Sequence, residues 1–234
     1  MKTILFVSYN ELHVTWGGIH RVNRLLMDGL SEAGYRCLYL INKGGDFFYI
    51  NNKEKNENRI DLDGLDCYLT EQRVKYIIDQ EGIFTDSFNL ALKMLNRKDV
   101  KLLTVFHSTP CIYEKLYGYR WLLEEFKNSS KIVAKVSYAI RLSVYPLWRW
   151  FSNRQTSKRY RNIYSISDKV ILLSKNEIPV FKEYVPNIEE DKCVAIPNAL
   201  TFSSTSDDSI LNEKENIVLI VSRLNDNEKR ISTA

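Results

Sequence analysis

The chain has 234 residues, of which 44% are hydrophobic and 26% charged, and this balance indicates a folded globular protein and excludes a fibrous or largely disordered one. Thirty-three basic and 29 acidic residues give a net charge of +4. The longest stretch without a charged residue, residues 193–206, has only 14 residues, so the sequence contains no segment of the roughly 20 apolar residues that a membrane-spanning helix needs.

The first 42 residues predict a strand, a loop, a helix and a second strand. Residues 3–8 are a short apolar, β-branched run that predicts a buried strand, and residues 36–42 are a second predicted strand. Between them, apolar residues recur at helical spacing from Ile19 to Leu30, after Gly17-Gly18 and before a stop at Gly34. This order predicts a βαβ unit whose two strands are parallel.

The alternation continues along the rest of the chain. Residues 47–69 are polar and ambiguous, and they fit an edge hairpin. Strands are predicted at 74–79, 101–107, 169–174 and 193–196, and helices at 87–96, after 176, and two or three within 112–165 with a break at Pro146. The fold class is therefore α/β, with a Rossmann-like, doubly wound parallel sheet. We expect one domain over residues 1–202, a linker over 203–216, and the start of a second, truncated domain over 217–234.

Cysteine usage and the N-terminus predict where the protein resides. The four cysteines (Cys37, Cys67, Cys111 and Cys193) are far apart and form neither a metal motif nor a disulfide framework. The N-terminal apolar run is too short for a signal peptide. We expect a reduced, cytoplasmic protein.

Three features follow predicted strands, where ligands bind in open parallel sheets. Gly17 and Gly18 open the first helix, whose N–H groups favour an anion, although a tight turn would also explain them, and no Gly-x-Gly-x-x-Gly motif is present. His107 ends a strand and can hydrogen-bond a ligand or only the local backbone. Arg223 and Lys229, six positions apart after the last strand, suit a diphosphate, or are part of a charged surface loop.

Further motifs extend this pattern along nearly the whole chain. They are Phe6-Val7-Ser8, Gly17-Gly18-Ile19 with Arg21, His107, Ser-Asp-Lys-Val-Ile-Leu-Leu-Ser at 167–174, Ala-Ile-Pro-Asn-Ala-Leu at 195–200, and Val-Ser-Arg-Leu at 221–224 with Glu228-Lys229. Together they resemble the family 4 retaining glycosyltransferases, which have the GT-B fold of two Rossmann-like domains facing each other across a cleft.

The resemblance implies a hexosyl transfer with retention, from a nucleotide-diphosphate sugar to a glycan or lipid-linked glycan. Arg223 and Lys229 would hold the leaving diphosphate, Gly17 and Gly18 would line the cleft near it, and His107 would contact the transferred sugar. Fixed cations and a helix N-terminus would stabilise the leaving group, so no metal or other cofactor is expected.

The chain departs from the family in two places. Ala199 stands where the family commonly has glycine, and no two of the 16 glutamates are eight positions apart, as the family's donor-binding pair is. We therefore expect an acceptor-side domain with only the first strand and loop of the donor domain, which by itself should be inactive or a poor catalyst.

A basic segment occupies residues 126–167, which carry nine lysines or arginines and no acidic residue, so that the rest of the chain has a net charge of −5. Tryptophan and tyrosine are interleaved with the cations, as on surfaces that contact anionic lipid. The residues predicted to contact a membrane or an anionic acceptor are Arg141, Trp148, Arg149, Trp150, Arg154, Lys158, Arg159 and Arg161. The alternatives are a solvated helix whose aromatic residues pack in the core and a nucleic-acid surface, which no recognition motif supports.

Two other functions remain open beside glycosyl transfer. A sugar-nucleotide epimerase would use the same fold, and a non-catalytic module would use the basic segment to dock on a membrane or a partner. The expected partners are a nucleotide-sugar donor, a glycan or lipid-linked acceptor and an anionic membrane, but not nucleic acid. A peripheral location on the inner face of the plasma membrane would fit these partners.

Overall fold

The structure is a computed structural model that describes residues 2–12, 17–43, 46–51, 56–80, 82, 86–110, 118–189 and 191–198. The chain divides into two compact units, Met1–Cys111 with Pro146–Ala199, and Ile112–Tyr145 with Leu200–Ala234. The predicted linker at 203–216 and the predicted start of a second domain at 217–234 lie outside the described residues.

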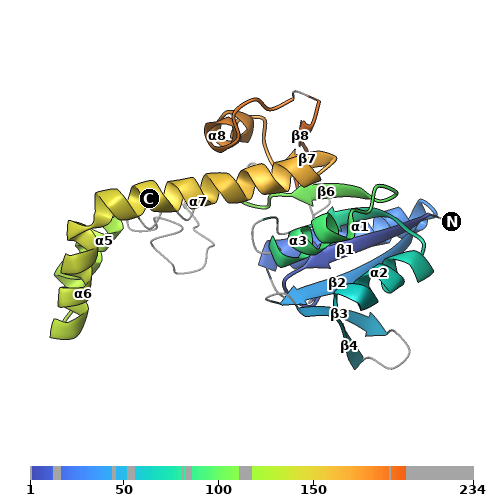
Figure 1. Cartoon of the computed structure of the whole chain (residues 1–234), viewed down its shortest axis with the longest axis horizontal. Helices are drawn as coiled ribbons and strands as arrows, with labels where there is room; N and C mark the ends of the chain where they lie inside the picture. The colour runs from blue at the N-terminus through green and yellow to red at the C-terminus, as the bar shows by residue number, and fades with distance from the viewer. Residues whose placement is uncertain are drawn as a thin grey trace, which may run out of the picture. The chain divides into compact units, whose positions relative to one another are not determined.

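A single sheet forms the centre of the first unit, in the order β4-β3-β2-β1-β5-β6-β7-β8 (Figure 1). Its strands are β1 (Thr3–Ser8), β2 (Arg36–Lys43), β3 (Asp46–Asn51), β4 (Asn56–Ile60), β5 (Val74–Asp79), β6 (Lys101–Val105), β7 (Lys169–Leu172) and β8 (Cys193–Ala195). β3 pairs antiparallel with β2 and β4, and the other pairs are parallel. The protein is thus α/β, with the mostly parallel, Rossmann-like sheet that the sequence predicts.

Seven helices accompany the sheet in the described part of the chain. The first unit contains α1 (Gly17–Glu32), α2 (Leu62–Glu71), α3 (Asp86–Leu95), α8 (Glu177–Tyr184) and all but the first residue of α7 (Tyr145–Ile166), and the second unit contains α5 (Tyr119–Asn128) and α6 (Ile132–Ser143). The predicted break at Pro146 is confirmed, because α6 ends at Ser143 and Pro146 lies in the first turn of α7, where no N–H is needed.

The sequence predicts the edge hairpin of β3 and β4 but not helix α2, which follows it. Gly64 and several aspartates give this segment a weak helix propensity. The Asp61 side chain caps the helix by accepting a hydrogen bond from the backbone N–H of Gly64 at 2.8 Å. Leu65 and Leu69, one turn apart, are fully buried, so packing outweighs the weak propensity.

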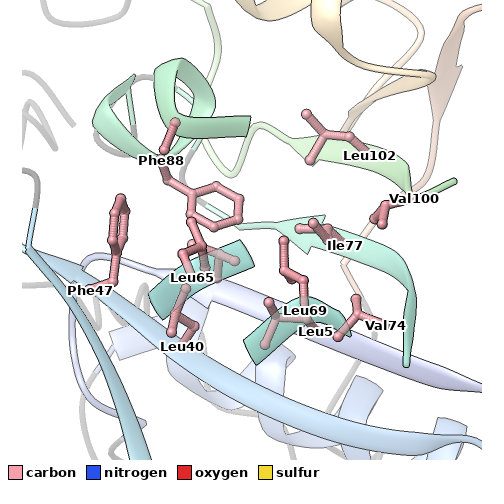
Figure 2. Close-up of a cluster of buried hydrophobic side chains, with 12 residues drawn as sticks. Leu5, Leu40, Phe47, Leu65, Leu69, Val74, Ile77, Phe88, Val100 and Leu102 are labelled. Carbon is pink, nitrogen blue, oxygen red and sulfur yellow. The ribbon is translucent and has the colours of Figure 1, made fainter. Parts of the chain in front are cut away.

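The two faces of the sheet carry separate hydrophobic cores, because alternate residues of β1 point to opposite faces. Ile4 and Phe6 pack on the face that α1 covers, with Met27 and Leu30. On the other face, shown in Figure 2, β1 packs with α2 and α3. The cluster drawn there includes Leu5, Leu40, Phe47, Leu65, Leu69, Val74, Ile77, Phe88, Val100 and Leu102.

A third cluster lies at the β6–β8 end of the sheet, where the C-terminal half of α7 packs with α8. Tyr160 of α7 contacts Phe106, Phe181 and Tyr184, with ring centroids 5.5–5.8 Å apart. Ile163, one turn further along α7, belongs to the same cluster. This half of α7 is therefore part of the core that supports β6 and the residues after it.

Candidate functional site

The order of the strands places a topological switch point between β1 and β5. The chain leaves β1 through α1 to reach β2 on one side, whereas β5 and the later parallel strands extend the sheet on the other side. In open α/β sheets, ligands bind beyond the carboxyl ends of the strands at such a point. Here those ends are Ser8 of β1 and Asp79 of β5, with β6 next to β5.

A hydrogen-bonded pair of side chains, one fully buried and one half-buried, lies just past this edge. Gln80 follows β5, and its backbone N–H donates to the carbonyl oxygen of Val7 at 2.9 Å, which continues the pairing of β5 with β1. Gln80 is fully buried, and its Oε1 lies 2.6 Å from Nε2 of His107, which follows β6 after Phe106. The backbone N–H of Phe106 in turn donates to Ile171 of β7 at 2.9 Å. Two adjacent strands thus hold the pair.

The hydrogen bond between Gln80 and His107 defines the state of the imidazole. An amide oxygen only accepts, so Nε2 of His107 carries the proton and Nδ1 of the neutral ring is an acceptor. Burial lowers the pKa of His107 to about 4. Hydrogen bonding with the Asn198 side chain raises the pKa, but by less than burial lowers it. At neutral pH the ring is therefore an uncharged hydrogen-bonding group rather than a cation.

Several polar atoms at this edge have hydrogen-bonding capacity that the described residues do not use. They are Oγ of Ser8, Nε2 of Gln80, Oδ1 of Asn89 and Nδ1 of His107. All four are shielded from solvent. Buried polar groups normally find partners, so a concentration of such atoms at a switch point is typical of a site that binds a polar molecule.

Asn89 of α3 holds Asp79 and Gly82 through contacts that the sequence does not reveal. Asp79 is fully buried and accepts a hydrogen bond from Asn89 Nδ2 of α3 at 3.2 Å, and the same nitrogen donates to the carbonyl oxygen of Gly82 at 3.4 Å. Gly82 has φ +46°, and a Cβ there would lie 2.8 Å from the ring of Phe106. Glycine is required at this position because the backbone rests on the residue that precedes His107.

The predicted glycines open α1, which begins at Gly17. Gly18 is exposed, and an added Cβ would meet nothing within 4 Å, so packing among the described residues does not require a glycine there. Because α1 follows β1 and His107 follows β6, the two features belong to strands separated only by β5. Arg223 and Lys229 lie outside the described residues.

The predicted basic surface on α7 divides into two parts. Leu147, Trp148, Trp150 and Phe151 are exposed, and the guanidinium of Arg154 lies over the Trp150 ring at 5.5 Å. The second half instead buries Thr156, Tyr160 and Ile163, although Lys158, Arg159 and Arg161 on the same half are exposed. Two more of the residues predicted to contact a membrane differ from these. Arg141 belongs to α6 and not to α7, and Arg149 of α7 is half-buried.

Among the residues that the structure describes, no cluster of three histidine, cysteine, aspartate or glutamate side chains could hold a metal ion, and no helix is long and apolar enough to cross a membrane. No protein-family model matches the chain, and no curated protein matches it significantly.

Proposed function

We propose that this protein takes part in retaining glycosyl transfer from a nucleotide-diphosphate sugar, and that the described sheet is the acceptor-side half of a GT-B enzyme. The observation that supports this most directly is the placement of the Gln80–His107 pair at the carboxyl edge of the sheet, beside the switch point. This is the edge at which the sequence resemblance requires a sugar-contacting histidine.

The state of His107 fits a contact with a hydroxyl group. Nδ1 of the neutral ring can accept a hydrogen bond from a sugar hydroxyl, while Gln80 holds the ring through Nε2. A neutral imidazole adds no positive charge beside an oxocarbenium-like sugar, so it can touch the transferred group without destabilising the charge that develops there. The positive charge that stabilises the leaving diphosphate would come from Arg223, Lys229 and the N–H groups at the start of α1.

Calorimetry of the full-length protein against UDP- and GDP-hexoses tests the donor part of the proposal. Arg223→Ala and Lys229→Ala should each weaken binding at least tenfold, since hydrogen bonds between charged groups contribute about 1.5–3 kcal/mol. Lys182→Ala on α8, a change of the same kind at an exposed position, is the matched control. Unchanged affinity in both variants would show that the phosphate assignment is wrong.

Product analysis of the full-length enzyme tests the role of His107. His107→Ala should lower kcat/KM for transfer by about 10²-fold, a typical cost of losing one hydrogen bond made to the reacting group. Thr109→Val is the control, because its hydroxyl lies nearby but donates to Glu177 at 3.1 Å. The anomeric proton of the product should show retention. Epimerised nucleotide sugar without transfer would instead identify an epimerase, and the proposed reaction would be rejected.

A further inference from the structure

Helix α6 carries an apolar face that α5, the other described helix of its unit, does not cover. We call Ile132, Val133, Val136 and Ile140, together with the C-cap residue Val144, the α6 apolar face. With residues about 100° apart around the helix axis, these five fall within an arc of about 120°. Their side chains are 46–82% exposed, and none of the residues of α6 is buried.

The opposite side of α6 packs against α5. Tyr138 meets Trp121 edge to face at 6.4 Å between ring centroids, and its hydroxyl donates to Glu125 at 3.4 Å. This fixes the rotation of α6, so that its apolar face points away from its helical partner. An aliphatic helix face that points away from α5 favours contact with another apolar medium.

The charged residues beside the α6 apolar face indicate which apolar medium it contacts. Lys135 and Arg141 lie about 60° beyond the two borders of the α6 apolar face on the same helical wheel. Both side chains are exposed, and the Arg141 guanidinium lies 5.9 Å from the Tyr138 ring. Residues 126–167 contain no acidic residue. An aliphatic face bordered by cations on both sides matches a bilayer surface, where apolar side chains enter the acyl boundary and the cations reach phosphate headgroups.

We propose that α6 attaches this protein to anionic lipid bilayers. The helix lies in the membrane–water interface, with the α6 apolar face toward the acyl chains. The attachment surface therefore differs from the one that composition predicts, since seven of the eight predicted residues lie on α7 and only Arg141 lies on α6. Protein-binding hot spots are rich in tryptophan and tyrosine, and the α6 apolar face has neither, which disfavours a protein partner or a second copy of the chain.

Flotation of the full chain with lipid vesicles tests the proposal. Vesicles of phosphatidylcholine alone are compared with vesicles containing about one third phosphatidylglycerol, to which the protein should bind more strongly. Val133→Ser with Ile140→Ser should lower the partition coefficient more than tenfold, because two aliphatic side chains leave the acyl boundary. The same change at exposed positions of α3, Leu90→Ser with Met94→Ser, is the control and should have less than a twofold effect.

A charge variant tests the headgroup contact separately. Lys135→Gln with Arg141→Gln should reduce binding to the anionic vesicles about 25-fold, because each cation near an anionic surface contributes about fivefold. Lys98→Gln with Lys182→Gln removes two exposed cations elsewhere and should have little effect. Circular dichroism checks that each variant is folded.

Three results would overturn the proposal. Binding that is the same in both α6 variants as in their controls would exclude α6 as the attachment surface. Indifference of the wild-type chain to lipid charge would exclude the headgroup contact. The third result is a wild-type chain that forms a dimer and does not bind vesicles, with a dimer that is lost in the Val133→Ser, Ile140→Ser variant. That result would assign the α6 apolar face to contact with a second copy of the chain. Vesicle binding and sugar transfer are measured separately, so either proposal can fail without the other.

Discussion

The half-buried imidazole of His107 should make the stability of the fold depend on pH. Burial lowers its pKa to about 4, with a smaller opposing effect from Asn198. In the unfolded chain the pKa returns to about 6.5. The unfolded chain therefore binds the proton more readily, so His107 stabilises the fold above about pH 6.5, and this contribution is lost as the pH falls toward 4.

The magnitude follows from the two pKa values. Their difference corresponds to about 3 kcal/mol in full, and proton linkage removes about 2 kcal/mol of the free energy of unfolding between about pH 7.5 and pH 5. That loss is a large fraction of the 5–15 kcal/mol by which domains are typically stable. Carboxylates also titrate in this range, so the contribution of His107 must be isolated by a variant that lacks it.

Urea denaturation of the wild type and of His107→Gln over this pH range makes the separation. Glutamine keeps a polar group near Gln80 but does not titrate, so other groups cancel in the comparison. The stability of the wild type relative to the variant should fall by about 2 kcal/mol from about pH 7.5 to pH 5. If the free energies of unfolding of the two proteins changed in parallel with pH, the burial argument would be refuted. An NMR titration that gives His107 a pKa near 6.5 would also refute it.

Three substitutions test the fold, each by urea denaturation. Gly82→Ala should destabilise it by more than about 1 kcal/mol, because φ is +46° and the new Cβ would strike Phe106; an unchanged midpoint would contradict this. Phe88→Ala should cost about 3–5 kcal/mol by opening a cavity in the core of Figure 2, and a loss below 1 kcal/mol would contradict that packing. Asp61→Ala should cost about 1 kcal/mol by removing the cap of α2, and no loss would argue against the cap.

The parallel core of the fold can be predicted because its strands are buried on both faces. All six residues of β1 are buried, so its sequence is a continuous apolar run rather than an alternating one. Helix α1 can also be predicted, because its apolar spacing and the Gly34 that follows it are visible in the sequence. In the structure Gly34 has φ +87°, which favours glycine after the end of a helix. Helix α2 is the contrary case, since its two buried leucines are too few to stand out among polar neighbours.

The candidate site can be predicted only in part. The prediction that His107 ends an apolar strand indicates an edge location. The structure places His107 at that edge, although β6 ends two residues earlier, at Val105. Its partner Gln80 is 27 positions away, and the two meet because β5 and β6 pair with Asp79 opposite Thr104. That register is a tertiary property, so no local pattern predicts the pair. The buried polar residues directly after β5 are the signal that could have suggested it.

The basic segment shows why composition does not locate a binding surface. Arginine beside tryptophan favours α7 as the membrane contact, yet Tyr160 and Ile163 of that helix are core residues. Aliphatic residues at helical spacing, as on α6, are the usual mark of a buried face, and a sequence does not state whether anything covers them. Tyr138 answers the question, because its contacts with α5 fix which side of α6 faces away. In the attachment that we propose, the membrane-facing side of α6 is the side turned away from α5, whereas the cations on α6 determine which kind of bilayer it prefers.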